Sequence, residues 1–462
     1  MSGSFQKIKD REQGLQRRLT SGQMSMIAIG GAIGTGLFLG SKFAIGFAGP
    51  SVLLSYAIGG LITLLLMGCL AEMTVAHATS GSFGAYAEHY ISPLAGFLVR
   101  YAYWSAIVLA VGTEVTAIAD YMGYWFPGVP SWWWISIFSG LLIAVNASSV
   151  KAFGAVEYGF SSIKIAAILG FILLGSVVVW GGSHPEYGVH LYTAGSGFLP
   201  HGWWGMWVAV IISIFSYLSV EMIAVAAGEA EDPERAVKQA FRATIVRLLV
   251  FYLLSLALIL AIVPWEKVGE GSSPFVTVMQ VLGIPYAADI LNFVVIVAAL
   301  SAMNSQLYIT TRMMFSLARG GDAPPALGKL SRNGVPLNAL MLSSVGIAVA
   351  TLLYVLYPKD AFILMISLSM FGAMFVWMMI FVTHLFFRHK YQAAGNPLLA
   401  FRMKLYPYTT LVGLVLMLAA MVTTLFTAEF NMTLKFGIPF LVVLVVLFKF
   451  VRKSHAPFDD AM

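Results

Sequence analysis

Apolar runs follow one another through nearly the whole chain, and each is about as long as the roughly 20 residues that a helix needs to cross a bilayer. We count twelve such runs, at about 21–45, 50–75, 97–122, 132–149, 158–180, 203–228, 243–264, 286–317, 337–357, 361–387, 406–427 and 435–450. Only 10% of the residues are charged and 59% are hydrophobic, whereas soluble domains carry roughly 25% charged residues. The pattern predicts an all-α integral membrane protein with twelve transmembrane helices and no large soluble domain.

The basic residues predict how these helices are oriented, because cytoplasmic loops are enriched in Lys and Arg. All but five of the 27 lysines and arginines fall on one side if the chain starts inside; Lys42, Lys267, Lys359 and Lys435 lie outside and Lys164 lies within a run. The tails at 1–20 and 451–462 are therefore predicted to be cytoplasmic. The net charge of +6 then faces anionic lipid of the bilayer, and no nucleic-acid partner is needed to explain it.

A cluster of glycines interrupts the first run, with the sequence IGGAIGTGLF at residues 29–38. Glycine costs roughly 1 kcal/mol relative to alanine in a helix interior, so its repeated use here needs a reason. One reason is close helix packing, because Gly36 and Gly40 form a Gly-x-x-x-Gly face. The other is a discontinuous helix whose free backbone groups, from Ala32 through Ile33, Gly34 and Thr35 to Gly36, bind a ligand.

A second irregular stretch lies in the sixth run, where serines at 213, 216 and 219 interrupt the apolar sequence before Glu221. Serine alone is weak evidence, because it is common in packed membrane helices. Together with the glycine cluster, however, the stretch matches the pattern of inverted-repeat transporters, whose helices are interrupted at corresponding positions of two halves. The pattern predicts one five-helix repeat at 21–180, a second at 203–387, and two additional helices at 406–450.

Three ionisable residues lie within the runs, where each costs at least roughly 2.5 kcal/mol at the bilayer centre. Glu114 follows Arg100 by 14 residues, about 21 Å along a helix, and is either a structural carboxylate bonded to a neighbouring helix or one that faces a substrate. Lys164 either extends its stem to the cytoplasmic interface or acts as a coupling charge. Glu221 belongs to the second irregular stretch, and with Lys164 it is a candidate for proton coupling.

In the eighth run, Asn304 and Ser305 either line a binding site or form hydrogen bonds between helices. The sequence has no zinc-protease, nucleophile-elbow or phosphate-loop motif and no metal-ligand spacing of its histidines. We therefore predict no catalytic residues, no metal site and no cofactor.

The motifs together resemble those of the amino acid transporter family of bacterial permeases, within the amino acid–polyamine–organocation superfamily, from about Leu19 to the twelfth run. They are GGAIGTGLF at 30–38, AGP at 48–50, LAEM at 70–73, GSF at 81–83, NASSVK at 146–151, AGE at 227–229 with DPE at 232–234, and LSAMNS at 300–305. The resemblance implies the LeuT-like fold, a five-plus-five inverted repeat with discontinuous first and sixth helices, in the plasma (inner) membrane.

The resemblance also implies roles for individual residues. The substrate carboxylate would be held by the backbone amides of Ile33, Gly34, Thr35 and Gly36, as suits a helix N-terminus. The substrate ammonium would be held by carbonyls at Ala32, Ile33, Phe215, Ser216 and Ser219, with Phe215 as an aromatic gate. Lys164 matches the lysine that proton-driven members place in the fifth helix. One departure is Ser219, because relatives usually have glycine two residues before the glutamate.

These observations predict a secondary transporter that imports an amino acid together with protons by alternating access. An obligate exchanger or a facilitator on the same fold is the alternative. A membrane sensor is less well supported because no output domain follows Lys453, and an enzyme is the least supported. The sequence does not predict which amino acid is transported, because Ser219 departs from the family pattern and Glu114 either faces the substrate or is structural.

Overall fold

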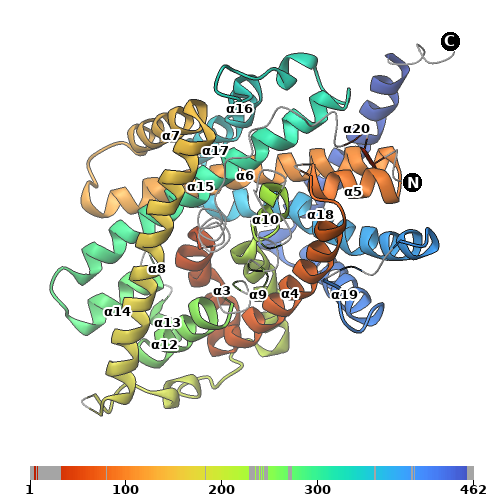
Figure 1. Cartoon of the computed structure of the whole chain (residues 1–462). Helices are drawn as coiled ribbons and strands as arrows, with labels where there is room; N and C mark the ends of the chain where they lie inside the picture. The colour runs from red at the N-terminus through yellow and green to blue at the C-terminus, as the bar shows by residue number, and fades with distance from the viewer. Residues whose placement is uncertain are drawn as a thin grey trace, which may run out of the picture.

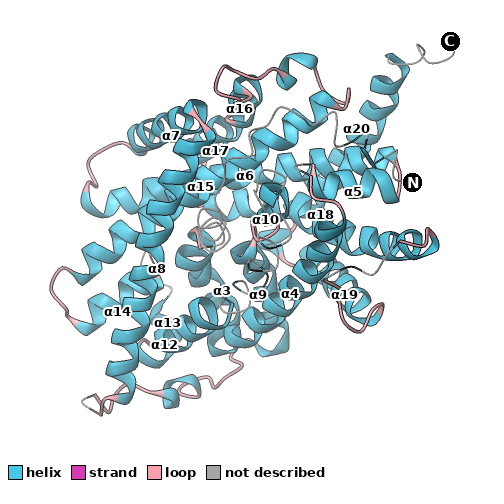
Figure 2. Cartoon of the chain, in the orientation of Figure 1, coloured by secondary structure: helices cyan, strands magenta, loops and turns pink. Residues whose placement is uncertain are grey.

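The computed structural model describes residues 5–6, 8, 33–79, 81–182, 184–227, 235, 239, 241, 243, 248–268, 273–357, 360–396, 399 and 401–454. Throughout these residues the regular structure is helical, and no strand occurs among them (Figure 2). Ten helices in this part of the chain are long and apolar enough to cross a membrane. The predicted class, an all-α membrane protein, is therefore confirmed, while the count of twelve spans is not.

The difference in number arises at two places. The first two predicted runs form one continuous helical stretch, Gly36–Ala76, which turns at Gly49, where φ is +58°. The seventh run contributes only a shorter apolar helix, Val250–Ile262, within the described residues. The inverted repeat stays a prediction.

The first half of the described chain contains these helices: η1 (Gly36–Gly40), α3 (Ser41–Ala48), η2 (Gly49–Ser51), α4 (Val52–Ala76), α5 (Ser82–Tyr90), α6 (Pro93–Trp125), α7 (Ser131–Ser148), α8 (Val150–Trp180), η3 (Val189–Tyr192), α9 (Gly202–Tyr217) and α10 (Met222–Ala226). The second half contains η5 (Leu248–Leu254), α12 (Ser255–Ile262), α13 (Trp265–Val268), α14 (Pro274–Leu282), α15 (Ala287–Arg319), η6 (Pro325–Gly328), α16 (Leu337–Ser343), α17 (Val345–Leu356), α18 (Ala361–Ala393), α19 (Tyr408–Thr423), η7 (Thr424–Phe426), η8 (Ala428–Phe430) and α20 (Met432–Ser454).

Helix α6 is central to the fold and packs along α15, α18 and α17 (Figure 1). Small residues allow its backbone to approach two of these neighbours. A Cβ atom on Gly346 of α17 would lie 2.0 Å from the carbonyl oxygen of Val108, and one on Gly372 of α18 would lie 2.3 Å from that of Ala102. Close backbone contact of this kind is how helices associate in lipid, where burial from water gives no driving force.

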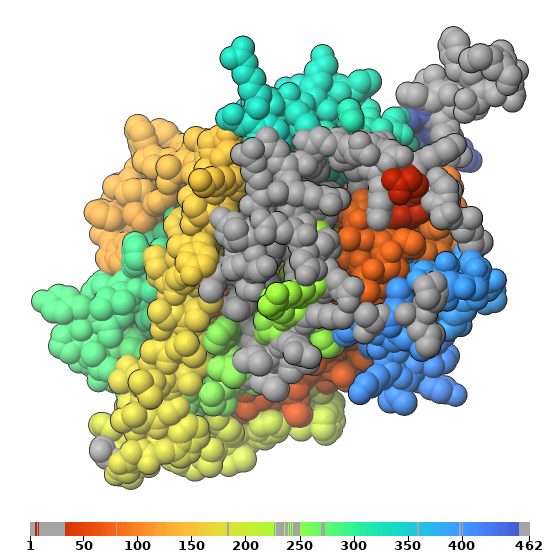
Figure 3. Space-filling view, in the orientation of Figure 1, coloured from red at the N-terminus to blue at the C-terminus, as the bar shows by residue number. Residues whose placement is uncertain are grey.

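Helix α8 lies at the surface of the molecule (Figure 3), and its two faces differ in burial. The outer face is apolar, with Leu169, Leu173 and Val177 exposed, as expected of a helix in contact with lipid acyl chains. The inner face is buried from end to end and carries polar side chains among its members: Val150, Phe153, Gly154, Glu157, Ser161, Lys164, Ile168, Phe171 and Gly175. The steps of three and four residues place all of these on one side of the helix.

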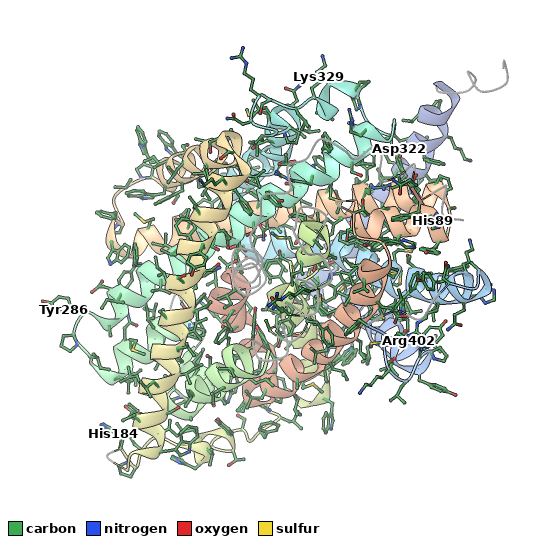
Figure 4. All side chains as sticks on the ribbon, viewed as in Figure 1. His89, His184, Tyr286, Asp322, Lys329 and Arg402 are labelled. Carbon is green, nitrogen blue, oxygen red and sulfur yellow. The ribbon has the colours of Figure 1, made fainter. Side chains whose placement is uncertain are left out.

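The loops are sorted to opposite sides of the molecule. His89, Asp322 and Lys329, from segments that the charge pattern assigns to one side of the membrane, lie at the upper and right side of Figure 4. His184 and Tyr286, from segments assigned to the other side, lie at the lower left. The placement of these five residues agrees with the charge pattern, and the cytoplasmic location of the termini stays a prediction.

Candidate functional site

The glycine cluster meets the irregular stretch of the sixth run inside the protein. The hydroxyl of Ser216 in α9 donates a hydrogen bond of 2.7 Å to the carbonyl oxygen of Gly36. A Cβ atom on Gly36 would lie 2.6 Å from the Cα atom of Ser216, and one on Gly40 would lie 3.4 Å from Ile212. Both glycines therefore pack against α9, and at position 36 no larger residue fits without a shift of backbone.

The sixth run changes direction directly after this contact. Helix α9 ends at Tyr217 and α10 begins at Met222, and between them Ser219 has a φ of +80°. Residues other than glycine rarely adopt a backbone conformation with a positive φ. In the first run, Ile33 and Gly34 are not helical and the helix runs on from Thr35.

A small cavity opens where the two stretches meet. It is lined by Gly34, Gly36, Glu114, Phe215, Ser216, Leu218, Ala302 and Gln306. The volume open to the centre of a water molecule is about 10 Å³, which is close to the space that one water needs. An amino acid can therefore enter only if the surrounding helices move apart.

Glu114 of α6 presents its carboxylate to this cavity and is only 3% exposed. One of its oxygens accepts from the backbone amide of Thr35 at 3.4 Å and the other from the Gln306 side chain at 3.5 Å. Both hydrogen bonds are longer than the usual 2.7–3.2 Å. Among the described residues the amide oxygen of Gln306 has no donor, so this wall of the cavity is rich in weakly satisfied acceptors.

Lys164 of α8 is fully buried and does not extend to an interface. Its ammonium donates to the carbonyl oxygen of Ile33 at 3.0 Å and to the hydroxyl of Ser301 in α15 at 2.7 Å. The lysine therefore connects α8 and α15 to the residue that precedes the cavity-lining Gly34.

A second buried carboxylate, Glu157, lies on the same face of α8. It accepts hydrogen bonds from the hydroxyl of Ser301, from Ser161 at 3.1 Å and from the side-chain amide of Asn304 at 3.1 Å. Asn304 in turn accepts from Asn146 of α7 at 2.8 Å. Asn304 is thus bound to a carboxylate between helices and does not line the cavity.

Glu221 lies apart from both groups and holds the turn between α9 and α10. One carboxylate oxygen accepts from the phenol of Tyr103 at 2.6 Å and from the backbone amide of Ser219 at 3.2 Å. Its other oxygen has no donor among the described residues. Within the same residues no three His, Cys, Asp or Glu side chains gather in a way that could hold a metal ion.

Comparison with known proteins places this arrangement in a family. The family model described as amino acid permease matches residues 23–458. The chain belongs to the amino acid permease family. This permease is 37% identical over 456 residues to the amino-acid permease RocE of Bacillus subtilis, covering 97% of each chain. It is also 37% identical over 441 residues to the aromatic amino acid transport protein AroP of Escherichia coli K12, covering 95% of this chain and 96% of the relative.

Family membership indicates that the permease transports amino acids and is a multi-pass protein of the inner membrane, and it confirms the resemblance found in the sequence. Of the predicted binding residues, those that line the cavity are Gly34, Gly36, Glu114, Phe215 and Ser216. Ala32 lies outside the described residues.

Four residues of the site were not predicted from the sequence of the permease. Three of them line the cavity, namely Leu218, Ala302 and Gln306, and the fourth, Glu157, is hydrogen-bonded to Ser301. Glu157 carried a usable signal, because it precedes Lys164 by seven residues and therefore lies two helical turns away on the same face. Gln306 carried another, as a polar residue two positions after Asn304 in an apolar run.

Proposed function

We propose that this permease is a secondary active transporter that takes up an amino acid with protons across the plasma membrane by alternating access. The observation that best supports the proposal is the bond from the buried Lys164 ammonium to the carbonyl oxygen of Ile33, next to the cavity. A fully buried ionisable group inside a membrane protein is a functional candidate by its cost alone. The five-plus-five repeat, with both termini cytoplasmic, is the framework of this proposal.

In the proposal the substrate carboxylate binds the free backbone amides of Ile33 to Gly36, where the partial positive charge of a helix N-terminus favours an anion. The amide of Thr35 at present faces the Glu114 carboxylate at 3.4 Å. The substrate carboxylate would take the place of Glu114 there. Phe215 would cover the bound amino acid, and carbonyls near Ser216 and Ser219 would receive its ammonium.

The proton acts through the strength of one hydrogen bond. A charged ammonium binds a carbonyl oxygen about twice as strongly as a neutral donor does. Loss of the proton from Lys164 therefore weakens its hold on Ile33 and frees the glycine cluster to move. Protonation would thus shift the balance between two positions of this segment, and only a difference in affinity of this kind can shift such a balance.

Uptake into proteoliposomes tests the proposal. Vesicles that hold the purified permease are given an inward pH gradient, and accumulation of labelled amino acids is followed with and without an uncoupler. We expect the labelled amino acid to accumulate inside the vesicles above its outside concentration, and we expect the uncoupler to abolish this accumulation. Lys164→Ala should lose it, whereas Lys151→Ala, a change at an exposed lysine of the same helix, should keep it.

A rate that is indifferent to the pH gradient would overturn proton coupling. If uptake then depends on unlabelled amino acid inside the vesicle, the permease is an exchanger; if neither condition matters, it is a facilitator. Competition by each of the common amino acids in the same assay identifies the substrate. AroP is named for aromatic amino acids, so aromatic substrates are the first to test.

A further inference from the structure

We propose that Glu157 is the group that receives the proton from Lys164, and that the hydroxyl of Ser301 carries the proton between them. This inference rests on the proposed proton coupling and adds to it a second titrating residue and a route. All three side chains are fully buried, and they come from α8 and α15, which pack along one another (Figure 1).

The hydrogen bonds have the direction that a relay needs. Lys164 donates to Ser301 at 2.7 Å, and Ser301 donates in turn to one carboxylate oxygen of Glu157. The serine hydroxyl therefore accepts a proton from one side while it offers its own to the other. A hydroxyl is suited to this because it is a donor and an acceptor at the same atom.

The groups that donate hydrogen bonds to Glu157 are all neutral. Its remaining hydrogen bonds come from the hydroxyl of Ser161 and the amide of Asn304, and in the described part of the chain no ion pair to Glu157 occurs within 4.0 Å. A buried carboxylate without a compensating charge is costly. The Lys164 ammonium, bridged by one hydroxyl, supplies that charge, and the two residues can lose their charges together.

The transfer is balanced in atoms and charge. An N–H bond of the Lys164 ammonium breaks as an O–H bond forms at Ser301, and the original Ser301 proton passes to the Glu157 carboxylate. The products are a neutral lysine amine, an unchanged serine and a protonated glutamic acid. One positive and one negative charge disappear, which removes the desolvation cost of both in a low-dielectric interior.

The direction along the helix agrees with inward release. Glu157 lies seven residues and Lys164 fourteen residues after Val150, the start of α8. The two residues are separated by about 10 Å of rise along the helix, and the transfer through the two hydrogen bonds of Ser301 moves the proton toward the end of α8 that the charge pattern predicts to be cytoplasmic. Glu114 also interacts electrostatically with Lys164, and it is the competing acceptor.

Five variants separate a relay from a structural contact, and one of them, Glu114→Gln, removes the competing acceptor. Ser301→Ala removes the bridging hydroxyl, and Ser301→Thr keeps it. Glu157→Gln removes the acceptor. The matched control is Ser161→Ala, because Ser161 donates to the same carboxylate oxygen as Ser301 but does not bridge to Lys164. Each is assayed for accumulation driven by a pH gradient and for exchange of labelled against unlabelled amino acid, which needs no net proton transfer.

We expect Ser301→Ala and Glu157→Gln to lose at least tenfold in gradient-driven accumulation while exchange stays within about twofold of the parent. Ser301→Thr and Ser161→Ala should keep both activities. Substrate-induced proton uptake, read with a pH dye, should fall together with accumulation.

Three results would overturn the relay while the parent permease stays proton-driven. In the first, Glu157→Gln and Ser301→Ala still accumulate substrate. In the second, Glu114→Gln abolishes coupling while Glu157→Gln does not, which would make Glu114 the acceptor. In the third, Ser161→Ala fails as badly as Ser301→Ala, which would give Glu157 a structural role only. If the parent itself ignores the gradient, the proposed function fails instead.

Discussion

Replacing glycines between Gly34 and Gly46 by alanine should destabilise the protein more, the less space the structure leaves for a methyl group. At Gly36 the added carbon would lie 2.6 Å from the backbone of Ser216, and at Gly34 it would lie 2.9 Å from a side-chain carbon. At Gly40 the nearest atom is at 3.4 Å, and at Gly46 no atom lies within 4 Å. Ordinary carbon contacts are about 3.5–4.0 Å, so the overlap at Gly36 is roughly 1 Å.

The free energy of each change has two parts. Overpacking costs typically about 1–3 kcal/mol, whereas alanine gains roughly 0.5–1 kcal/mol over glycine in a helix. Gly46→Ala has only the favourable helix contribution. The difference in free energy of unfolding between Gly46→Ala and Gly36→Ala therefore measures the cost of the steric overlap at Gly36, about 1–3 kcal/mol. Because Ser216 meets Gly36 through its backbone, a rotamer change cannot relieve this overlap.

The assay is the apparent melting temperature of the purified variants, measured from the monodisperse fraction that remains after heating. We expect Gly36→Ala to melt lowest, then Gly34→Ala, with Gly40→Ala and Gly46→Ala at or above the parent. The folded fraction of Gly36→Ala should also lose transport. A Gly36→Ala variant as stable and as active as Gly46→Ala would refute the contact between the first and sixth runs.

Three further outcomes are expected. Tyr103→Phe removes the 2.6 Å hydrogen bond to Glu221 and should cost about 1.5–3 kcal/mol, seen as a lower melting temperature; no change would mean that the bond contributes nothing. Arg388→Met removes the arginine that pairs with the buried Glu72 and leaves that carboxylate only its contacts with His384 and the Met403 amide; it should cost about 3–5 kcal/mol, while the double change with Glu72→Met should recover stability, and a double variant as unstable as the single would contradict this. Burial lowers the pKa of His89 below its usual 6.5, so its neutral form contributes stability above about pH 6.5 that is lost as the pH falls through the lower folded-state pKa; His89→Gln should flatten the acid side of the stability profile.

The sequence was sufficient to predict the class of the protein and the meeting of its two irregular stretches. Charge is too scarce and apolar runs are too long for a soluble fold, and the glycine cluster has no local reason to exist without a close neighbour. Gly36 does have such a neighbour, Ser216, 180 residues along the chain. Glu114 was also predictable as a buried side chain, because its distance from Arg100 excludes contact with water at the membrane surface.

The partners of these residues were not predictable in the same way. Glu157 lies within two turns of a predicted helix end, where a carboxylate usually meets water, and only the packing of α15 onto α8 shows that it is fully buried. Asn304 was a candidate for lining the binding site because it is polar, yet it forms hydrogen bonds with Asn146 and Glu157. These two pairs are 147 and 158 residues apart, and no local pattern encodes which helices become neighbours.

The conformation of Ser219 gives a physical meaning to the glycine that the family resemblance leads us to expect at this position. A φ of +80° is readily adopted by glycine and costs other residues on the order of 1 kcal/mol or more. This chain accepts that cost and places a hydroxyl, buried and without a hydrogen-bond partner among the described residues, next to the turn. Backbone freedom and side-chain chemistry therefore compete for one position. A permease with glycine there turns easily and contributes no side-chain contact, whereas serine makes the turn stiffer and supplies a polar group.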